Sequence, residues 1–165
     1  MKKNRINNNL ITDFYKKVDS KELSEVFLMT FPIALIHKNI FSHLESFLKE
    51  KFDLLNSELD VLASLYTHGK VLTPTQLYDL TIFSSGGMTK ILKRLQERDL
   101  IYRQEDKNDK RYMLVCLSDK GETLVKESLQ EIPKECNKYF EVLNQEQREL
   151  FSDMLKKILL NINKI

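Results

Sequence analysis

The sequence predicts a mainly α-helical fold with one small β-hairpin. Glycine and proline are scarce, with 4 Gly and 3 Pro in 165 residues, which is too few for an all-β protein with many tight turns. Most apolar residues recur at helical steps of three or four, whereas two short runs, 100–103 and 112–117, have the composition of strands. The length and the 42% content of hydrophobic residues indicate one globular domain with a sizeable core.

Composition also predicts where the protein resides. No uncharged apolar run reaches the roughly 18 residues of a transmembrane helix, and the N-terminus lacks the apolar region of a secretory signal. The 2 Cys are too few for a disulfide scaffold, and the net charge of +2 does not by itself indicate a partner. We therefore expect a cytoplasmic protein without membrane contact.

Two long helical stripes at the chain ends predict a dimer. Residues 1–21 read as a polar, basic arm, partly helical from Asn9, and a wide apolar stripe then predicts helix over 22–52, with a kink or two abutting helices at Pro32. Residues 119–165 predict two further helices, the first bent at Pro133. These stripes carry more apolar surface than one small lobe can cover, so we expect 22–52 and 119–165 to bury themselves against a second copy.

Residues 56–96 predict three shorter helices. Asn56 or Ser57 is expected to cap the first, and Gly69 to end it in the left-handed conformation. Thr73-Pro74-Thr75-Gln76 is a capping box with proline at the first helical position, which starts a brief second helix. Ser84 or Ser85 would cap the third.

That third helix is apolar on one face and basic on the other. Its inward positions are Met88, Ile91, Leu92 and Leu95, whereas 84–96 holds three basic residues and no acid. Residues 73–96 therefore predict a helix-turn-helix, the alternative being a helical hairpin with an ordinary solvated basic face. The small Gly86 and Gly87 would let backbone N–H groups approach a phosphate.

The strand-like runs predict a wing over 100–118. A charged loop, 105–111, separates them at hairpin length, and its tip can bring a cation to the minor groove of DNA. We expect Arg111 to enter that groove and Asp109 to hold the guanidinium in place by a charge-assisted pair. The predicted DNA-binding lobe is thus 56–118.

Two motifs of this lobe resemble the MarR family of bacterial winged helix-turn-helix regulators. The first runs from Leu72-Thr73-Pro74-Thr75-Gln76-Leu77 through Ser84-Ser85-Gly86-Gly87-Met88-Thr89 to Leu92-Lys93-Arg94-Leu95. The second is Asn108-Asp109-Lys110-Arg111 followed by Val115-x-Leu117-Ser118-x-x-Gly121, with Ser118 where the family usually has Thr. The resemblance covers about 23–163, so 22–165 would form one MarR-type domain. It looks most like the urate- and phenol-responsive branch, although the chain lacks the Trp common in that branch's ligand pocket.

The resemblance implies a homodimeric repressor that binds a pseudo-palindromic operator in double-stranded DNA and is released by a small molecule. Transferred to this chain, the DNA contacts are Thr75, Ser84, Ser85, Gly86, Thr89, Lys90, Lys93, Arg94, Lys110 and Arg111. Lys93 and Arg94 lie late in their helix, which favours phosphate contacts over base contacts. A phenolic or other aromatic effector would bind between the dimer helices and the lobe, near His37, Phe41, Tyr66 and His68.

Other classes of function remain as alternatives. A redox sensor would use Cys116, expected on the more exposed face of its strand, or Cys136 on an apolar stripe. A winged-helix module for protein interaction would not bind DNA. We expect no metal site, because His37 and His43 are six residues apart and do not share a helix face. We expect no cofactor and no enzyme activity, since catalytic and phosphate-loop motifs are missing.

Overall fold

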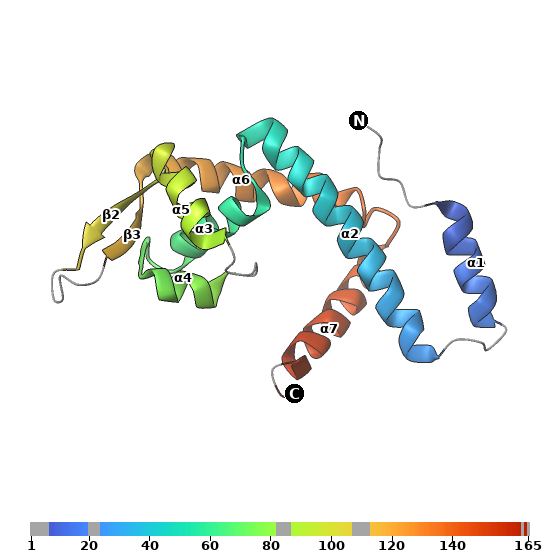
Figure 1. Ribbon diagram of the computed structural model, residues 1–165. Helices are drawn as coiled ribbons and strands as arrows, with labels where there is room; N and C mark the ends of the chain where they lie inside the picture. Colours follow the sequence, from blue (N-terminus) through green and yellow to red (C-terminus); the bar gives the residue numbers. More distant parts are fainter. Residues whose placement is uncertain (1–6, 20–23, 82–86, 107–112, 163, 165) are drawn as a thin grey trace. The chain divides into compact units, whose positions relative to one another are not determined.

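The computed structural model describes residues 7–19, 24–81, 87–106, 113–162 and 164, and it confirms a mainly helical fold with one small sheet (Figure 1). Its elements are, in chain order, α1 (Asn8–Asp19), α2 (Glu25–Phe52), α3 (Asn56–Thr67), β1 (Val71–Leu72), α4 (Pro74–Leu80), α5 (Met88–Glu97), β2 (Ile101–Glu105), β3 (Met113–Leu117), α6 (Asp119–Asn137) and α7 (Gln145–Ile162). The chain divides into two compact units, 1–128 and 129–165, and α6 runs from the first into the second. Among the described residues, no helix is long and apolar enough to cross a membrane.

The N-terminal arm contains a helix, which confirms the helix predicted from Asn9. Residues 8–19 form the 12-residue helix α1, whose Phe14 is buried. The Phe14 ring lies 4.7 Å from that of Phe31 and 5.8 Å from that of Phe27, both on α2. The alternative of two abutting helices was wrong, because α2 is one helix of 28 residues with Pro32 inside it.

Local hydrogen bonds set the ends of α3 and α4. The predicted caps of α3 were wrong: Leu55 is the N-cap residue, and its N–H donates to Glu58 Oε2 at 2.8 Å. The chain leaves α3 through Gly69, which has the expected positive φ of 87°. The capping box of α4 is confirmed, because Gln76 N–H donates to Thr73 Oγ1 at 3.1 Å and Thr73 N–H donates to Gln76 Oε1 at 2.8 Å.

This cap gives a first prediction. Replacing Thr73 with alanine removes the acceptor for one otherwise unsatisfied N–H at the start of a helix of only two turns. We expect the free energy of unfolding to fall by about 1 kcal/mol. Urea denaturation followed by far-UV circular dichroism measures this, and an unchanged midpoint would show that the cap contributes nothing. Thr73→Ser is the control, since serine keeps the hydroxyl acceptor.

The sheet has three antiparallel strands in the order β1-β3-β2, so β3 is central. Val71 pairs with Cys116 on one side of β3, and Tyr102 pairs with Cys116 on the other. The predicted wing strands are thereby confirmed, and the predicted extended link at 70–72 becomes the third strand. Burial of Val115, Cys116 and Leu117 shows that both faces of β3 are covered at this end.

The start of α6 packs tightly against the turn that joins α5 to β2. Ser118 Oγ accepts the N–H of Gly121 at 2.9 Å and donates to the carbonyl of Asp99 at 2.7 Å, which confirms a cap at this position. A Cβ at Gly121 would lie 2.1 Å from the carbonyl oxygen of Leu100. Glycine is therefore required here by close approach of two backbones.

Helix α7 exposes most of its apolar side chains, because no other described part of the single chain packs over them. Its start is capped as predicted, by reciprocal hydrogen bonds of 2.9 Å between Asn144 and Gln147. None of its residues is buried in this single chain. Its exposed large hydrophobic residues are Leu150, Met154, Leu155, Ile158, Leu159, Leu160 and Ile162.

Candidate nucleic-acid interface

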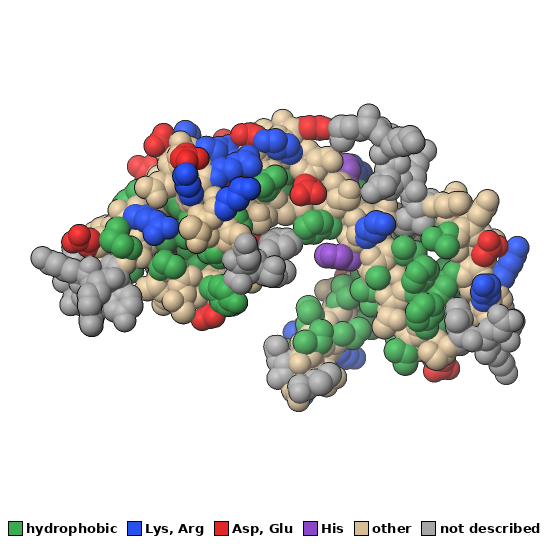
Figure 2. All heavy atoms as spheres, viewed as in Figure 1, with side chains coloured by type: hydrophobic (Ala, Val, Ile, Leu, Met, Phe, Trp, Pro, Cys, Tyr) green, Lys and Arg blue, Asp and Glu red, His purple; other side chains and the backbone are tan. Residues whose placement is uncertain are grey.

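Helix α5 presents the polar face that the sequence predicts for a recognition helix. Leu92 and Leu95 are buried, whereas Thr89, Lys90 and Lys93 are exposed. The predicted cap at Ser84 or Ser85 was wrong, because the helix begins at Met88 with Gly87 as its N-cap residue. Basic side chains gather on the surface of the lobe that carries it (Figure 2). Such a face can bind phosphate oxygens and base edges because Lys and Thr side chains supply donors.

Lys93 is a surface cation with a weak partner. Its ammonium group lies 3.8 Å from Glu97 Oε1, with 76% of the lysine side chain and 61% of the glutamate side chain exposed. An exposed pair of this kind contributes about 0–1 kcal/mol. The lysine can therefore exchange Glu97 for a DNA phosphate at little cost.

Arg94 differs from its lysine neighbours, because its guanidinium group is paired inside the protein. Its Nε lies 2.9 Å from Oε1 of Glu58 on α3, whose side chain is buried. The sequence places Arg94 among the DNA contacts, and that role stays a prediction. Its observed partner is a carboxylate in the core of the lobe.

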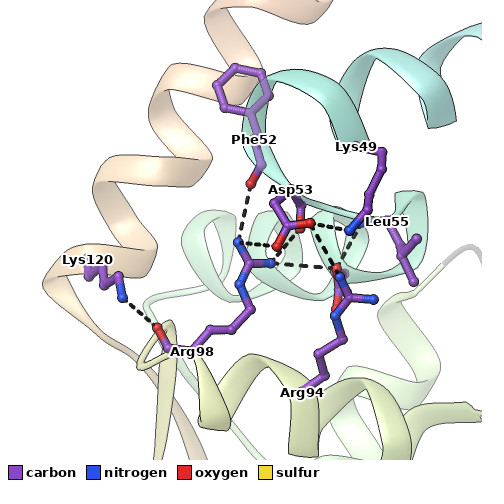
Figure 3. A network of polar contacts seen from close by, with 8 residues as sticks. Lys49, Phe52, Asp53, Leu55, Arg94, Arg98 and Lys120 are labelled. Carbon is purple, nitrogen blue, oxygen red and sulfur yellow. Dashed lines mark hydrogen bonds and ion pairs between the residues drawn. The ribbon is translucent and has the colours of Figure 1, made fainter.

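Arg98, at the end of α5, joins the same network (Figure 3). Its guanidinium donates to the carbonyls of Asp53 at 2.6 Å and Phe52 at 3.3 Å, where α2 ends. Asp53 also pairs with Lys49, whose hydrogen bond is the main cause that lowers the pKa of the Asp53 carboxyl, with Arg98 and Arg94 adding to the effect. Figure 3 shows these side chains meeting between α2 and α5.

Sequence reasoning assigned no role to Glu58, Asp53 or Arg98. A signal for Glu58 was present: it lies one turn before Val61 and Leu62, on the face of α3 that these apolar residues bury. A charged side chain on an apolar helix face requires a buried partner of opposite charge. Nothing local identifies Arg94 or Arg98 as that partner, since they follow 36 and 40 residues later.

Several predicted contacts lie outside the described residues. These are Ser84, Ser85 and Gly86 before α5, and Asp109, Lys110 and Arg111 in the wing loop. Thr75 is described, and it is exposed in the first turn of α4.

The four predicted effector residues fall into separate local contacts. The rings of His37 and Phe41 lie 5.5 Å apart on α2, and the Lys126 ammonium lies 5.7 Å from the ring of Tyr66. His68 Nδ1 contacts the carbonyl oxygen of Ser64 at 3.0 Å on its own helix. An open cleft of about 390 Å³ in the lobe has other lining residues: Arg98, Leu100, Lys120, Thr123, Leu124 and Glu127.

The prediction that Cys116 faces the more exposed side of its strand was wrong. Cys116 is 1% exposed, because its central strand is covered on both faces. Burial raises the pKa of the Cys116 thiol, and a hydrogen bond with Tyr102 opposes this in part. Burial also raises the pKa of the half-buried Cys136 thiol. Within the described ranges, no group of three or more His, Cys, Asp or Glu side chains is arranged to hold a metal ion.

The raised pKa values predict slow thiol chemistry. A thiol whose pKa lies above the usual value holds less thiolate at neutral pH, so its alkylation rate rises only at more alkaline pH than for a free cysteine. We expect iodoacetamide to label both cysteines slowly in the native protein, Cys116 more slowly than Cys136 because it is better buried. Mass spectrometry across a pH series measures this, with the guanidinium-unfolded chain as control; rapid labelling of Cys116 at neutral pH would contradict it.

Comparisons with known proteins agree with this architecture. Residues 52–111 match the sequence model described as the MarR family. The chain is 26% identical over 129 residues to the HTH-type transcriptional regulator MhqR of Bacillus subtilis, covering 78% of this chain and 88% of that protein.

Two solved structures share the fold. One is an organohalide-sensing transcriptional regulator in its 2,4-dichlorophenol-bound form, with a TM-score of 0.69 and 22% identity, covering 84% of this chain and 81% of that one. The other is Staphylococcus aureus MepR in complex with DNA, with a TM-score of 0.67 and 23% identity, covering 81% and 97%. The chain is therefore similar to MarR-family regulators over residues 52–111, and it shares the winged-helix fold of these two solved structures.

Proposed function

We propose that the protein is a homodimeric repressor that binds a pseudo-palindromic operator through α5 and the wing. The observation that carries this proposal is the division of α5 into a buried face, Leu92 and Leu95, and an exposed face with Thr89, Lys90 and Lys93. Two such helices, related by the two-fold axis of a dimer, would read the two half-sites of the operator.

The wing completes the proposed interface. Arg111 would enter the minor groove, and Asp109 would hold its guanidinium before DNA arrives, which reduces the side-chain entropy lost on binding. Further phosphate contacts around α5 and Arg111 would come from Thr75, Ser84, Ser85, Gly86 and Lys110. Support for the wing comes from the sequence motif and from the two strands that the structure places on either side of the loop.

The dimer rests on exposed apolar surface. Hydrophobic residues stay exposed along α7 and at the start of α2, where Val26, Met29 and Ile33 are at least half uncovered. A monomer rarely exposes that many large apolar side chains unless a partner covers them. We propose a second copy of this chain as that partner.

We also propose that a small aromatic molecule releases the protein from DNA. The solved regulator with bound 2,4-dichlorophenol supports an aromatic ligand class, since it shares this fold. The His37–Phe41 pair supplies ring faces, and it is the part of the four-residue prediction whose side chains contact one another. A thermal-shift screen with phenols and aromatic acids tests this, and failure of every compound to stabilise the protein or release DNA would contradict it.

DNA binding by α5 is tested by its salt dependence. Lys93→Ala is expected to weaken binding and to reduce the slope of log K against log salt by about 1, because one phosphate contact is lost. The matched control is Lys134→Ala on α6, since Lys134 is 72% exposed and pairs with Glu131 on its own helix, as Lys93 does with Glu97. The probe is a duplex selected by the protein from a randomised pool.

The possible outcomes separate the proposed functions. A smaller slope of log K against log salt in Lys93→Ala, with the parent slope kept in Lys134→Ala, supports DNA binding through α5. Equal slopes in the parent and both variants would contradict DNA binding through α5. If the parent selects no duplex at low salt, the protein is an interaction module rather than an operator-binding repressor.

A further inference from the structure

One buried carboxylate lies where α3 and α5 meet the end of α2. Glu58 is 0% exposed, and its Oε2 caps the start of α3 by accepting the N–H of Leu55. Glu58 Oε1 has no hydrogen bond within the described part of the chain. Arg94 Nε lies 2.9 Å from this oxygen and compensates the charge of the carboxylate. Arg98 Nη1 follows at 3.9 Å from Oε2. A buried carboxylate is stable only beside its cations, so α5 is held to the start of α3.

Arg98 extends this connection to α2. The carbonyls of Phe52 and Asp53 lie at the C-terminal end of α2, where they have no partner within the helix, and the Arg98 guanidinium donates to both. The negative end of the helix dipole strengthens that contact. Asp53 takes the left-handed conformation that turns the chain from α2 towards α3, with φ of 52°.

The two arginines lie one helical turn apart on α5. Side chains separated by four residues project from the same face of a helix, so Arg94 and Arg98 fasten one side of the C-terminal end of α5. Two fixed points restrict both rotation about the helix axis and sliding along it. Thr89, Lys90 and Lys93 are exposed on the same helix.

We propose that Glu58 is a positioning residue for sequence-specific DNA binding, which acts by fixing Arg94 and Arg98 and thereby the orientation of α5. The inference rests on the proposed function, in which α5 contacts the operator. Arg94 then contributes to recognition by holding α5 through its ion pair with Glu58. The phosphate contacts of α5 are made by Lys90 and Lys93. Base-edge contacts need the correct orientation, whereas non-specific attraction to phosphates depends mainly on charge.

The test replaces Glu58 with glutamine, which keeps the shape and the acceptor for Leu55 N–H but removes the charge. Binding is measured to the selected duplex and to an unrelated duplex, at a temperature where circular dichroism shows both proteins folded. We expect the ratio of the two affinities to fall about tenfold in Glu58→Gln. The salt slope on the unrelated duplex should stay that of the parent, because no cation on the DNA side is lost.

Glu122→Gln is the matched control. Glu122 is a partly buried carboxylate on α6 that pairs with Lys70 at 2.6 Å and with Lys126 at 2.7 Å, and neither lysine is on α5. We expect its affinity ratio to stay within about twofold of the parent. An unchanged ratio in Glu58→Gln, or an equal fall in both variants, would overturn the positioning role.

Arg94→Gln and the double variant distinguish positioning from direct contact, and Arg94→Gln replaces Glu58→Gln if the latter does not fold. If Arg94 acts through Glu58, its loss lowers the affinity ratio without changing the salt slope, and the double variant matches the single variants. A slope reduced by about 1 in Arg94→Gln would instead show that Arg94 binds a phosphate itself. If the parent binds no DNA, the proposed function fails; if it binds and these variants match it, only this inference fails.

Discussion

Replacing Gly121 with alanine is expected to lower the free energy of unfolding by about 3 kcal/mol, at the upper end of the range for overpacking. The added Cβ would lie 2.1 Å from the carbonyl oxygen of Leu100 and 2.9 Å from Leu117 Cδ1. Leu117 could move, but the carbonyl belongs to backbone that accepts the N–H of Ser118 at 3.1 Å. The start of α6 would therefore have to move away from the lobe.

Urea denaturation of the parent and the variant measures the change. Gly87→Ala is the matched control, since its added Cβ would meet Ile91 Cδ1 at 3.9 Å, an ordinary contact, at a negative φ of −138°. We expect that control to stay within about 1 kcal/mol of the parent. A Gly121→Ala midpoint equal to that of the control would show that α6 does not pack against Leu100 as described.

Ile158→Asp is expected to convert the protein from dimer to monomer. Ile158 lies on α7, one turn after Met154 and Leu155, and half of its surface is exposed in the single chain. If a second copy covers this stripe, a carboxylate there loses its hydration without a partner. The dimer dissociation constant should rise on the order of 100-fold.

Sedimentation equilibrium across a concentration series measures this shift. Lys156→Asp is the control, because it introduces the same side chain two residues away, on the opposite side of α7, and it should remain dimeric. The expected mass is about twice 19.5 kDa for the parent and 19.5 kDa for Ile158→Asp. A dimeric Ile158→Asp would exclude this face of α7 from the interface.

Elements with strong local signals could be predicted from the sequence. The capping box at Thr73, the reciprocal cap between Asn144 and Gln147, and the left-handed exit at Gly69 are each set by neighbours within five residues. The order of helices and strands could also be predicted, because hydrophobic periodicity is a pattern of neighbouring residues. The family resemblance predicts the same order of elements, because its motifs include α4, α5 and the wing.

Features that depend on distant residues could not be predicted in this way. The packing of helix α1 depends on the contact between Phe14 and Phe31 of α2, which no local pattern shows. Cys116 is buried because both faces of β3 are covered at this end, although alternation along β3 alone places it on the exposed face. Arg94 appears as another cation of a basic helix until Glu58, 36 residues earlier, is placed beside it.

The central claim, that the protein binds DNA as a dimer through α5, is tested most directly by the stoichiometry of its complex with the selected duplex at several salt concentrations. Analytical ultracentrifugation with labelled duplex gives both the mass of the complex and its affinity. Two chains per duplex are expected, with a logarithm of affinity that falls linearly with the logarithm of salt concentration and a smaller slope for Lys93→Ala. One chain per duplex, or an affinity that does not change with salt, would contradict it.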